Sequence, residues 1–316
     1  MPRVLVIART PEVYVEAVRK RFPDIEIDCC RHYGEIPEAL ERFRPEVVFS
    51  SKIGGPFPRE LLLGAESVVW IQTASAGVDH LLPLSPAIQV TSASGIHDEA
   101  LSDYVVCAAL LWNLHFPRFF RQQAERRWEN SELTPAAGQT LVILGLGGIG
   151  TLTASKAKAL GMRVLGVRAR PETTSPYVDE VHGVERLKEL AGRADVLAIT
   201  LPLTPKTRGL VGPEILQSMK PGSILVNISR GGIVNEEALV HALREGPLEG
   251  AVSDVFSTEP LPEDSELWTL PNLVITPHTG DIAGWKTKVA QLFCENLERF
   301  REGRPLRNLV DPERGY

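Results

Sequence analysis

LVILGLGGIG, at residues 141–150, is the stretch that decides the fold class of this chain. Its first four apolar residues predict a buried strand, and the alanine- and lysine-rich run that follows predicts a helix from Ile149 to about Leu160. MRVLGV, at residues 162–167, predicts a second strand. Strand, glycine-rich turn, helix and second strand together form one βαβ unit of about 30 residues, which is the building block of a parallel sheet.

The turn in this unit has the pattern GxGxxG. We expect Gly145 to allow the tight turn, Gly147 to let a phosphate approach the backbone, and Gly150 to let the helix pack close to the strand. The helix N-terminus adds unpaired N–H groups and a positive dipole end, which favour an anion. An ordinary βα turn that needs glycine only for packing is the alternative. The complete βαβ unit favours a dinucleotide site, which includes Gly148 and Ile149.

The composition is that of a globular protein, with 316 residues, 43% of them hydrophobic and 23% charged, and the length favours two domains. The net charge of -6 argues against a nucleic-acid or anionic-membrane partner. No apolar run approaches the roughly 18 residues that a membrane span needs. The four cysteines have no metal or redox spacing and the first ten residues resemble a strand, so we expect a cytoplasmic protein without a metal site.

Strand and helix patterns alternate along the chain, which predicts an α/β fold with parallel sheets. The first hundred residues contain no glycine fingerprint, so they form a separate α/β unit ahead of the dinucleotide strand. A last helix is predicted over residues 285–301. The apolar runs that predict strands lie at residues 4–7, 47–49, 68–71, 141–144, 164–167, 196–199, 224–226 and 273–275.

A long helix is predicted over residues 98–116, with Asp98 and Glu99 in its first turn, where their charges favour the helix dipole. Pro117 is expected to end this helix. The middle of the helix, residues 105–112, is apolar on all sides, so we expect it to be buried between domains or subunits.

The end of the second dinucleotide strand indicates which cofactor is bound. An acid at this point binds the ribose hydroxyls of NAD, whereas an arginine accommodates the 2′-phosphate of NADP. Here no acid occurs before Glu172, and Arg168 and Arg170 lie on one face of an extended chain, which suits a phosphate dianion. Two solvated arginines at a strand end are the alternative. We expect NADP, with NAD as the alternative cofactor.

A dinucleotide enzyme that transfers hydride needs a cation, a proton donor and a group that tunes the donor. Arg230 directly follows a predicted strand and precedes two glycines, which suits a fork for a carboxylate, although a surface arginine that caps a loop fits equally well. Of the seven histidines, His278 alone combines a strand-end position with flanking Pro277 and Gly280. Glu259 lies in a turn, and a carboxylate beside an imidazole favours the imidazolium form.

Several blocks of the sequence together resemble the D-isomer-specific 2-hydroxyacid dehydrogenase family. They occur in the order and at the spacings of that family, and the resemblance covers nearly the whole chain. The blocks are SAGVDHL (75–81), GLGGIG (145–150), LPLTPKT (201–207), VNISRGGIVNEEAL (226–239), DVFSTEPLP (254–262) and NLVITPHTG (272–280).

This resemblance implies two flavodoxin- or Rossmann-like doubly wound domains with the active site in a cleft between them. It implies a discontinuous substrate domain, residues 1–98 plus 283–316, and a dinucleotide-binding domain, residues 99–282. It also implies that Arg230 pairs with the substrate, that Glu259 orients His278, and that His278 is the general acid/base. The backbone N–H groups near Ala76 and Gly77 would hold the substrate carboxylate. The implied cofactor contacts are Leu201, Pro202, Thr207, Ile228, Arg230, Asp254, His278 and Gly280.

The activity implied by the resemblance is reversible reduction of a small 2-oxo acid, such as glyoxylate or hydroxypyruvate, to the D-2-hydroxy acid. The family resemblance also implies a homodimer, formed through the helix after Asp98. A phosphoglycerate- or phosphite-type dehydrogenase is an alternative within the family. A non-catalytic, cofactor-sensing protein similar to the corepressors of this fold is an alternative outside enzymes.

Overall fold

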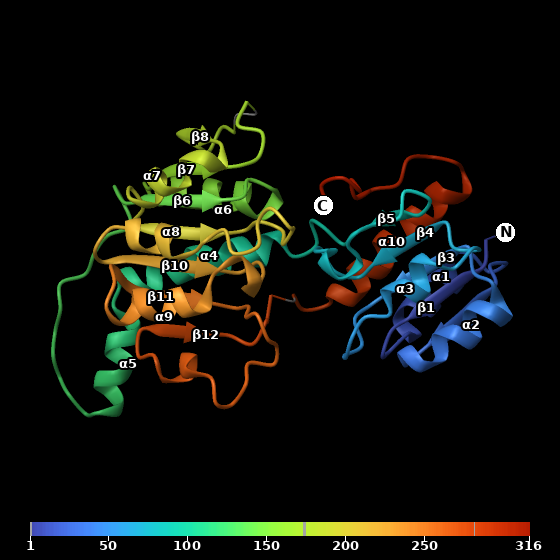
Figure 1. The fold of residues 1–316 in the computed structure, drawn as a ribbon, viewed down its shortest axis with the longest axis horizontal. Helices are drawn as coiled ribbons and strands as arrows, with labels where there is room; N and C mark the ends of the chain where they lie inside the picture. The colour runs from blue at the N-terminus through green and yellow to red at the C-terminus, as the bar shows by residue number, and fades with distance from the viewer. Residues whose placement is uncertain (1, 173–174, 281) are drawn as a thin grey trace. The chain divides into compact units, whose positions relative to one another are not determined.

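The computed structural model describes residues 2–172, 175–280 and 282–316. The chain folds as two compact units, shown in Figure 1. The N-terminal unit combines Met1–Ile96 with Ile282–Tyr316, and the central unit is His97–Asp281.

The N-terminal unit is built on five parallel strands in the order β2-β1-β3-β4-β5, which is the flavodoxin order. Helices α1 and α10 cover one face of this sheet, and α2 and α3 cover the other. The strands are β1 (Val4–Ile7), β2 (Ile27–Cys30), β3 (Val47–Ser50), β4 (Trp70–Thr73) and β5 (Gln89–Thr91). The helices are α1 (Glu12–Arg21), α2 (Ile36–Phe43), α3 (Arg59–Leu63) and α10 (Trp285–Arg301).

The central unit is built on seven parallel strands in the order β12-β11-β10-β9-β6-β7-β8. Helices α4 and α6 cover one face, and α7, α8 and α9 cover the other. The strands are β6 (Thr140–Leu144), β7 (Arg163–Val167), β8 (Glu180–His182), β9 (Val196–Ile199), β10 (Ser223–Asn227), β11 (Leu248–Ser253) and β12 (Leu273–Ile275). The helices are α4 (Asp98–Asn113), α5 (Phe116–Ala124), α6 (Gly148–Ala159), α7 (Leu187–Ala191), α8 (Pro213–Ser218) and α9 (Glu236–Arg244).

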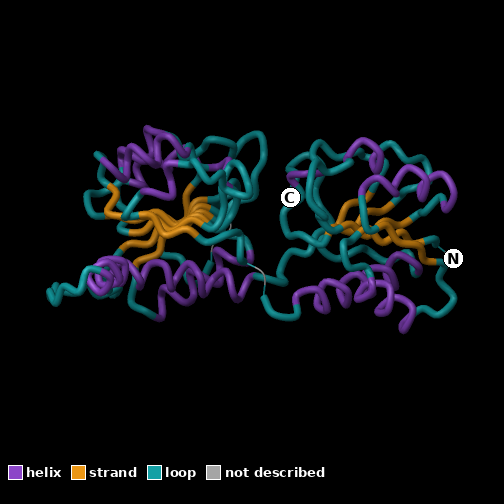
Figure 2. The backbone as a smooth tube through the Cα atoms, turned by 90° about the horizontal axis from the view of Figure 1, so that it is seen from below, coloured by secondary structure: helices purple, strands orange, loops and turns teal. Residues whose placement is uncertain are grey.

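Short 3₁₀ helices lie in the connections of both units: η1 (Tyr33–Glu35), η2 (Asp79–Leu81), η3 (Val184–Arg186), η4 (Gly231–Ile233) and η5 (Glu266–Thr269). In each unit the strands form a middle layer with helices on both faces, as Figure 2 shows. Because both faces are covered, the inner strands are continuous apolar runs, and every residue of β1 and β9 is buried. The predicted fold class, α/β with two doubly wound parallel sheets, is confirmed.

The prediction of one helix over residues 98–116 is wrong. Helix α4 ends at Asn113, and His115 takes a left-handed conformation with φ 54° before α5 begins. Pro117 does not end a helix but lies in the first turn of α5, where its missing N–H would have had no intrahelical partner. Within its own unit the stretch 105–112 leaves Cys107 exposed, and its expected burial against a second subunit stays a prediction.

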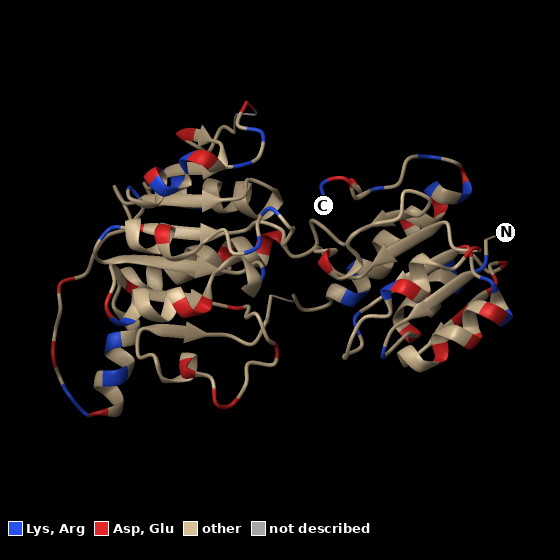
Figure 3. Cartoon of the chain, viewed as in Figure 1, with Lys and Arg blue, Asp and Glu red and all other residues tan. Residues whose placement is uncertain are grey.

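Charged side chains of both signs are spread over both units, as Figure 3 shows. Among the described residues, no helix combines the length and the apolar composition that crossing a membrane requires. In the same part of the chain, no three His, Cys, Asp or Glu side chains are grouped so that they could hold a metal ion.

Glu180 connects the edge strand β8 to neighbouring side chains through several hydrogen bonds. Its carboxylate accepts hydrogen bonds from Arg193 at 2.6 Å, from Arg163 at 2.5 Å and from His182 at 2.9 Å. The Arg193 guanidinium, followed by His182, lowers the pKa of Glu180 to about 2 against the opposing effect of burial. The carboxylate is therefore ionised throughout the physiological pH range.

Replacing Glu180 with glutamine should destabilise the central unit by about 1–2 kcal/mol at pH 7, after allowance for solvent screening. Because the folded pKa lies below the unfolded value of 4.5, this contribution is complete above pH 4.5 and is lost as the pH falls toward 2. Urea unfolding at pH 7 and pH 3 measures the difference, which should shrink at pH 3. The exposed Glu172, changed to glutamine, is the control, and an equal loss of stability in both variants would contradict the assignment.

Candidate active site

The glycine turn joins β6 to α6 and brings backbone atoms unusually close. Gly145 has φ +110°, a conformation that favours glycine, and the Thr200 hydroxyl donates a hydrogen bond to its carbonyl at 2.7 Å. A Cβ at Gly150 would stand 2.0 Å from the Gly145 oxygen, so only glycine fits there. Gly147 is exposed, and no atom lies within 4 Å of where its Cβ would be. The N-terminus of α6 is thus open on the side of Gly147, which fits a pyrophosphate.

The neighbouring loop after β9 closes one side of this turn. The backbone N of Leu201 lies 3.0 Å from where a Gly145 Cβ would be. The Thr207 hydroxyl donates to the Pro202 carbonyl at 2.7 Å, which holds the loop in a tight turn. Strand β6 lies between β7 and β9, so the turn stands where the strand order reverses, the usual ligand position in open α/β sheets.

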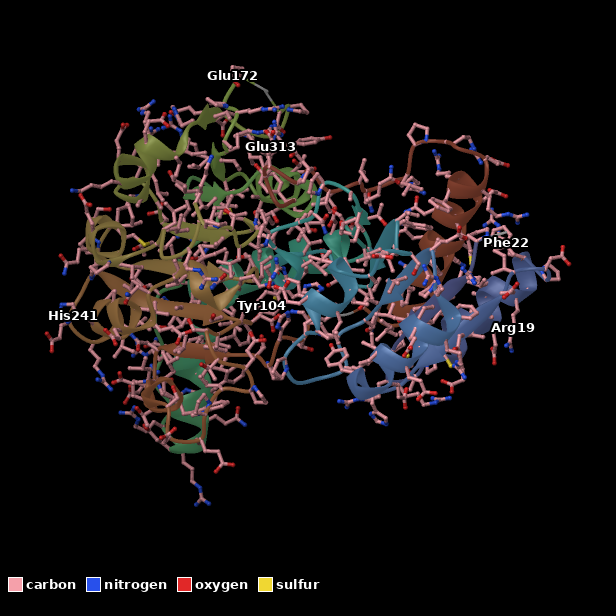
Figure 4. The ribbon with its side chains drawn as sticks, turned by 45° about the vertical axis from the view of Figure 1, so that its right-hand side comes forward. Arg19, Phe22, Tyr104, Glu172, His241 and Glu313 are labelled. Atoms are coloured by element: carbon pink, nitrogen blue, oxygen red, sulfur yellow. The ribbon has the colours of Figure 1, made fainter. Side chains whose placement is uncertain are left out.

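Arg168 and Arg170 lie just past β7. The backbone N–H of Arg168 donates to the His182 carbonyl at 3.0 Å, and its side chain is half-buried, whereas Arg170 is exposed. The chain bends at Ala169, so the expectation that both arginines lie along an extended chain is wrong. Glu172, the first acid after the strand, is exposed at the outer tip of the loop in Figure 4.

His278 and Glu259 form a hydrogen-bonded pair. His278 follows β12, and its Nδ1 lies 2.7 Å from Glu259 Oε2. The other carboxylate oxygen of Glu259 accepts the backbone N–H of Phe256 at 2.9 Å, which fixes the orientation of the carboxylate. The His278 side chain is 45% exposed, so its ring can be reached from solvent while Nδ1 is engaged.

The pKa of Glu259 is lowered from its usual value. Burial acts to raise it, but the hydrogen bonds from His278 and Phe256 and the positive charge of Arg230 outweigh that effect. The carboxylate therefore stays ionised near neutral pH and is available as the acceptor for His278.

Arg230 reaches the same place because Gly231 allows a close approach of two loops. A Cβ on Gly231 would stand 1.9 Å from the backbone carbon of Phe256. The Arg230 guanidinium donates to the Ser229 carbonyl at 2.8 Å, and its charge acts on Glu259. Since β10, β11 and β12 are adjacent, the loops at their carboxyl ends bring these three side chains together.

The remaining predicted contacts of the central unit lie at the same edge of the sheet. Ile228 is buried just past β10, and Gly280 packs against α4, since its Cβ would stand 2.8 Å from Leu101. Asp254 is buried just past β11. Gly148 lies in the first turn of α6, where a Cβ would collide with the Asp98 carboxylate, and Ile149 packs on the core beneath it.

In the N-terminal unit, Ala76 and Gly77 follow β4 in a loop whose ends are fixed by backbone hydrogen bonds. Ala74 N–H donates to the Ser50 carbonyl at 2.8 Å, and Ala93 N–H donates to the Ser75 carbonyl at 3.0 Å. Ala76 is exposed.

Sequence reasoning missed Asn227, Thr276 and Tyr104. The Asn227 side chain bridges its own loop, donating to the Arg230 carbonyl at 3.3 Å and accepting from Ser229 N–H at 3.2 Å. An asparagine at the end of a strand, three residues before the arginine, was the available signal for this turn.

The chain is similar in sequence and in fold to known proteins. Residues 106–280, more than half of the chain, match the family model described as D-isomer specific 2-hydroxyacid dehydrogenase, NAD binding domain. A glyoxylate reductase of Korarchaeum cryptofilum is 30% identical, and the match covers 99% of this chain and 96% of that protein. A D-3-phosphoglycerate dehydrogenase of Methanocaldococcus jannaschii is 31% identical over 87% of this chain, which spans 53% of that longer protein.

A solved structure shows the same fold over the whole length. It is a D-isomer specific 2-hydroxyacid dehydrogenase from Xanthobacter autotrophicus Py2 in complex with NADPH and MES. The two chains are 29% identical and superpose with a TM-score of 0.87 over 100% of each. The sequence resemblance is confirmed, and this chain belongs to the D-isomer specific 2-hydroxyacid dehydrogenase family of NAD(P)-binding oxidoreductases.

Proposed function

We propose that the protein catalyses NADPH-dependent reduction of a small 2-oxo acid, of the glyoxylate or hydroxypyruvate kind, to the D-2-hydroxy acid. The observation that carries the proposal is the His278–Glu259 pair, 2.7 Å apart, beside Arg230 at adjacent strand ends. The relative named glyoxylate reductase, which this chain matches over 99% of its length, supports the substrate class.

In this proposal the three side chains divide the work. Arg230 holds the substrate and polarises its ketone oxygen, an effect that grows as negative charge develops on that oxygen. His278 donates a proton to the same oxygen from Nε2, the ring nitrogen that Glu259 does not engage. Glu259 keeps the imidazole oriented through its bond to Nδ1. The backbone N–H groups of Ala76 and Gly77 bind the substrate carboxylate.

A bound nicotinamide dinucleotide supplies the hydride. We propose that its pyrophosphate lies at the α6 N-terminus, against the turn from Gly145 to Gly150, and that Arg168 and Arg170 bind the 2′-phosphate of NADP. The open side of Gly147 supports the position of the pyrophosphate, and the absence of an acid between β7 and Glu172 supports NADP over NAD. The solved structure from Xanthobacter autotrophicus, which holds NADPH, supports it further.

The other proposed cofactor contacts surround this turn. They come from the loop after β9 and from the ends of β10, β11 and β12. They are Leu201, Pro202, Thr207, Ile228, Asp254 and Gly280. With these roles, the N-terminal unit is the substrate domain and the central unit is the dinucleotide-binding domain.

We also propose that the protein is a homodimer, formed through the helix after Asp98, α4, together with the chain that follows it. Figures 1 and 2 show the chain after α5 extending away from the rest of the central unit. It carries Trp128, which is 102% exposed, and α5 carries Phe120, which is 58% exposed. Exposed apolar side chains that form a contiguous surface mark a site that another molecule covers, and a second copy is the occupant that we propose for this segment.

Sedimentation velocity of the wild type and of Trp128→Ser tests the dimer. The wild type should sediment as a dimer, and the variant should shift toward the monomer because a large apolar contact is lost. A wild type that sediments as a monomer at micromolar concentration would contradict the proposal.

Turnover of a substrate panel tests the proposed activity. Glyoxylate, hydroxypyruvate and pyruvate are offered with NADPH and with NADH, and 3-phosphoglycerate and phosphite are offered with NADP and NAD. Oxidation of NADPH by glyoxylate or hydroxypyruvate is the expected result. Activity with 3-phosphoglycerate or phosphite alone would point to another dehydrogenase of the family, and no oxidation or reduction in any combination would favour a cofactor-sensing protein.

A further inference from the structure

Asp254 is a buried carboxylate whose bonds converge on the loop that carries His278. Its Oδ1 accepts the Thr276 hydroxyl at 2.5 Å and the backbone N–H of Thr279 at 2.8 Å. Its backbone carbonyl accepts the N–H of His278 at 2.8 Å. One residue therefore binds His278 and both flanks of its loop.

Tyr104 of α4 extends this set of bonds. Its hydroxyl lies 2.7 Å from the Thr276 hydroxyl oxygen. Thr276 has a single hydroxyl hydrogen, which it donates to Asp254, so Tyr104 must be the donor to Thr276. Burial raises the pKa of Tyr104, so the phenol keeps its hydrogen for this bond. Figure 4 labels Tyr104, which comes from a helix far from the loop in sequence.

The backbone of His278 needs such support. Its φ is 51°, in the left-handed region that a residue with a Cβ seldom adopts. Conformations of this kind persist where the surrounding bonds over-determine them, and they gather at functional sites. Here the bonds to Asp254 come from residues 276, 278 and 279, so they hold the loop on both sides of the strained residue.

We propose that Tyr104, Thr276 and Asp254 form a positioning chain that holds His278 in its left-handed conformation and so aligns its Nδ1 with Glu259. Tyr104 and Thr276 touch no reacting atom in this scheme; they act through His278.

The two oxygens of Asp254 then have different tasks. Oδ1 is committed to Thr276 and Thr279. Oδ2 lies 3.7 Å from where a Gly280 Cβ would be and makes no hydrogen bond to residues 2–172, 175–280 or 282–316. Oδ2 is therefore the oxygen that we assign to a bound cofactor. The same carboxylate would then contact the cofactor through Oδ2 and hold the loop of the proton donor His278 through Oδ1.

Hydrogen–deuterium exchange of the loop, followed by mass spectrometry, tests the structural claim without any turnover. Thr276→Val removes the hydroxyl at nearly constant volume and should speed exchange of the His278 and Thr279 amides by about 10-fold or more. Thr276→Ser keeps the hydroxyl and should behave as the wild type. Thr279→Val is the matched control, because it removes a neighbouring hydroxyl but keeps the backbone N–H that Asp254 binds.

Kinetics with glyoxylate and NADPH test the consequence, which rests on the proposed function. Thr276→Val should lower kcat by about 10- to 100-fold, because a small displacement of the proton donor is costly. The KM for glyoxylate and the Kd for NADPH should change by less than about 3-fold, and serine should restore kcat. If the positioning chain only stabilised the fold, Thr276→Val would lower the melting temperature but would not lower kcat selectively while KM stays nearly constant.

The outcomes separate the two claims. Unchanged exchange in Thr276→Val, or a serine variant as impaired as valine, would overturn the positioning chain. If the wild type does not turn over glyoxylate, the proposed function fails. The exchange experiment still tests whether the positioning chain holds the His278 loop. If Thr276→Val does not fold, Tyr104→Phe, which removes only the terminal oxygen, is compared with the wild type in the same two measurements.

Discussion

Replacement of His278 with alanine should lower kcat for glyoxylate reduction by about 10²- to 10⁴-fold, the usual contribution of a positioned general acid. The reason is that no other described histidine lies beside Glu259 at the strand ends that also carry Arg230. The Kd for NADPH should stay within about 2-fold, since the glycine turn and the arginines after β7 are untouched. Stopped-flow kinetics and fluorescence titration measure the two quantities.

The chain offers a matched control for this variant. His241, on α9 and labelled in Figure 4, also pairs with a glutamate, its Nδ1 lying 3.5 Å from Glu245. Since that pair is on a helix surface, His241→Ala should leave kcat unchanged. Wild-type turnover in the His278 variant would remove His278 from the mechanism, whatever the control shows.

Replacement of Arg168 with aspartate should reverse the cofactor preference. The guanidinium that we assign to the 2′-phosphate is replaced by a carboxylate, which repels the phosphate of NADP and binds the ribose hydroxyls of NAD. The ratio of kcat/KM for NADPH to that for NADH should fall by about 100-fold or more, as the loss of one charge-assisted pair and the gain of a like-charge contact imply.

Two further variants make this result specific. Arg19→Asp changes the net charge equally on α1 of the other unit and should leave the ratio unchanged. The double change of Arg168 and Arg170 to alanine should lose NADPH preference without gaining affinity for NADH. Preference for NADPH that survives the double change would show that neither arginine selects the cofactor.

Much of the fold was predictable because short runs of apolar residues mark the strands. Most inner strands are buried on both faces, so most of their residues are apolar. The predicted strands at residues 4–7, 196–199 and 273–275 coincide with β1, β9 and β12. Of the strands that these apolar runs do not cover, β2, β5 and β8 are edge strands, whereas β11 is an inner strand in which Glu249 and Gly250 interrupt the apolar residues. Polar residues interrupt the apolar run in each of the three missed edge strands, Asp28 in β2, Gln89 in β5 and Glu180 in β8, whereas the edge strand β12 is apolar and was predicted.

The candidate site also contains residues that the sequence predicts and contacts that it does not predict. His278, Glu259 and Arg230 could be proposed from sequence because each follows a strand, and parallel strands bring their carboxyl ends to one edge. The contact of Tyr104 with Thr276 joins residues 172 positions apart and depends on how α4 packs on the sheet. The close approach at Gly231 likewise depends on the distance between two loops, which no pattern of residue types encodes.

Because the N-terminal unit consists of two chain segments, it cannot complete its fold until the end of translation. The sheet face that buries Tyr14 of α1 is completed by Val289 and Phe293 of α10, and Val310 N–H donates to the Val90 carbonyl on β5 at 2.8 Å. A ribosome delivers these partners only after the entire central unit has emerged. The unit that begins the chain is therefore the last to be closed, and its apolar face stays uncovered during most of translation.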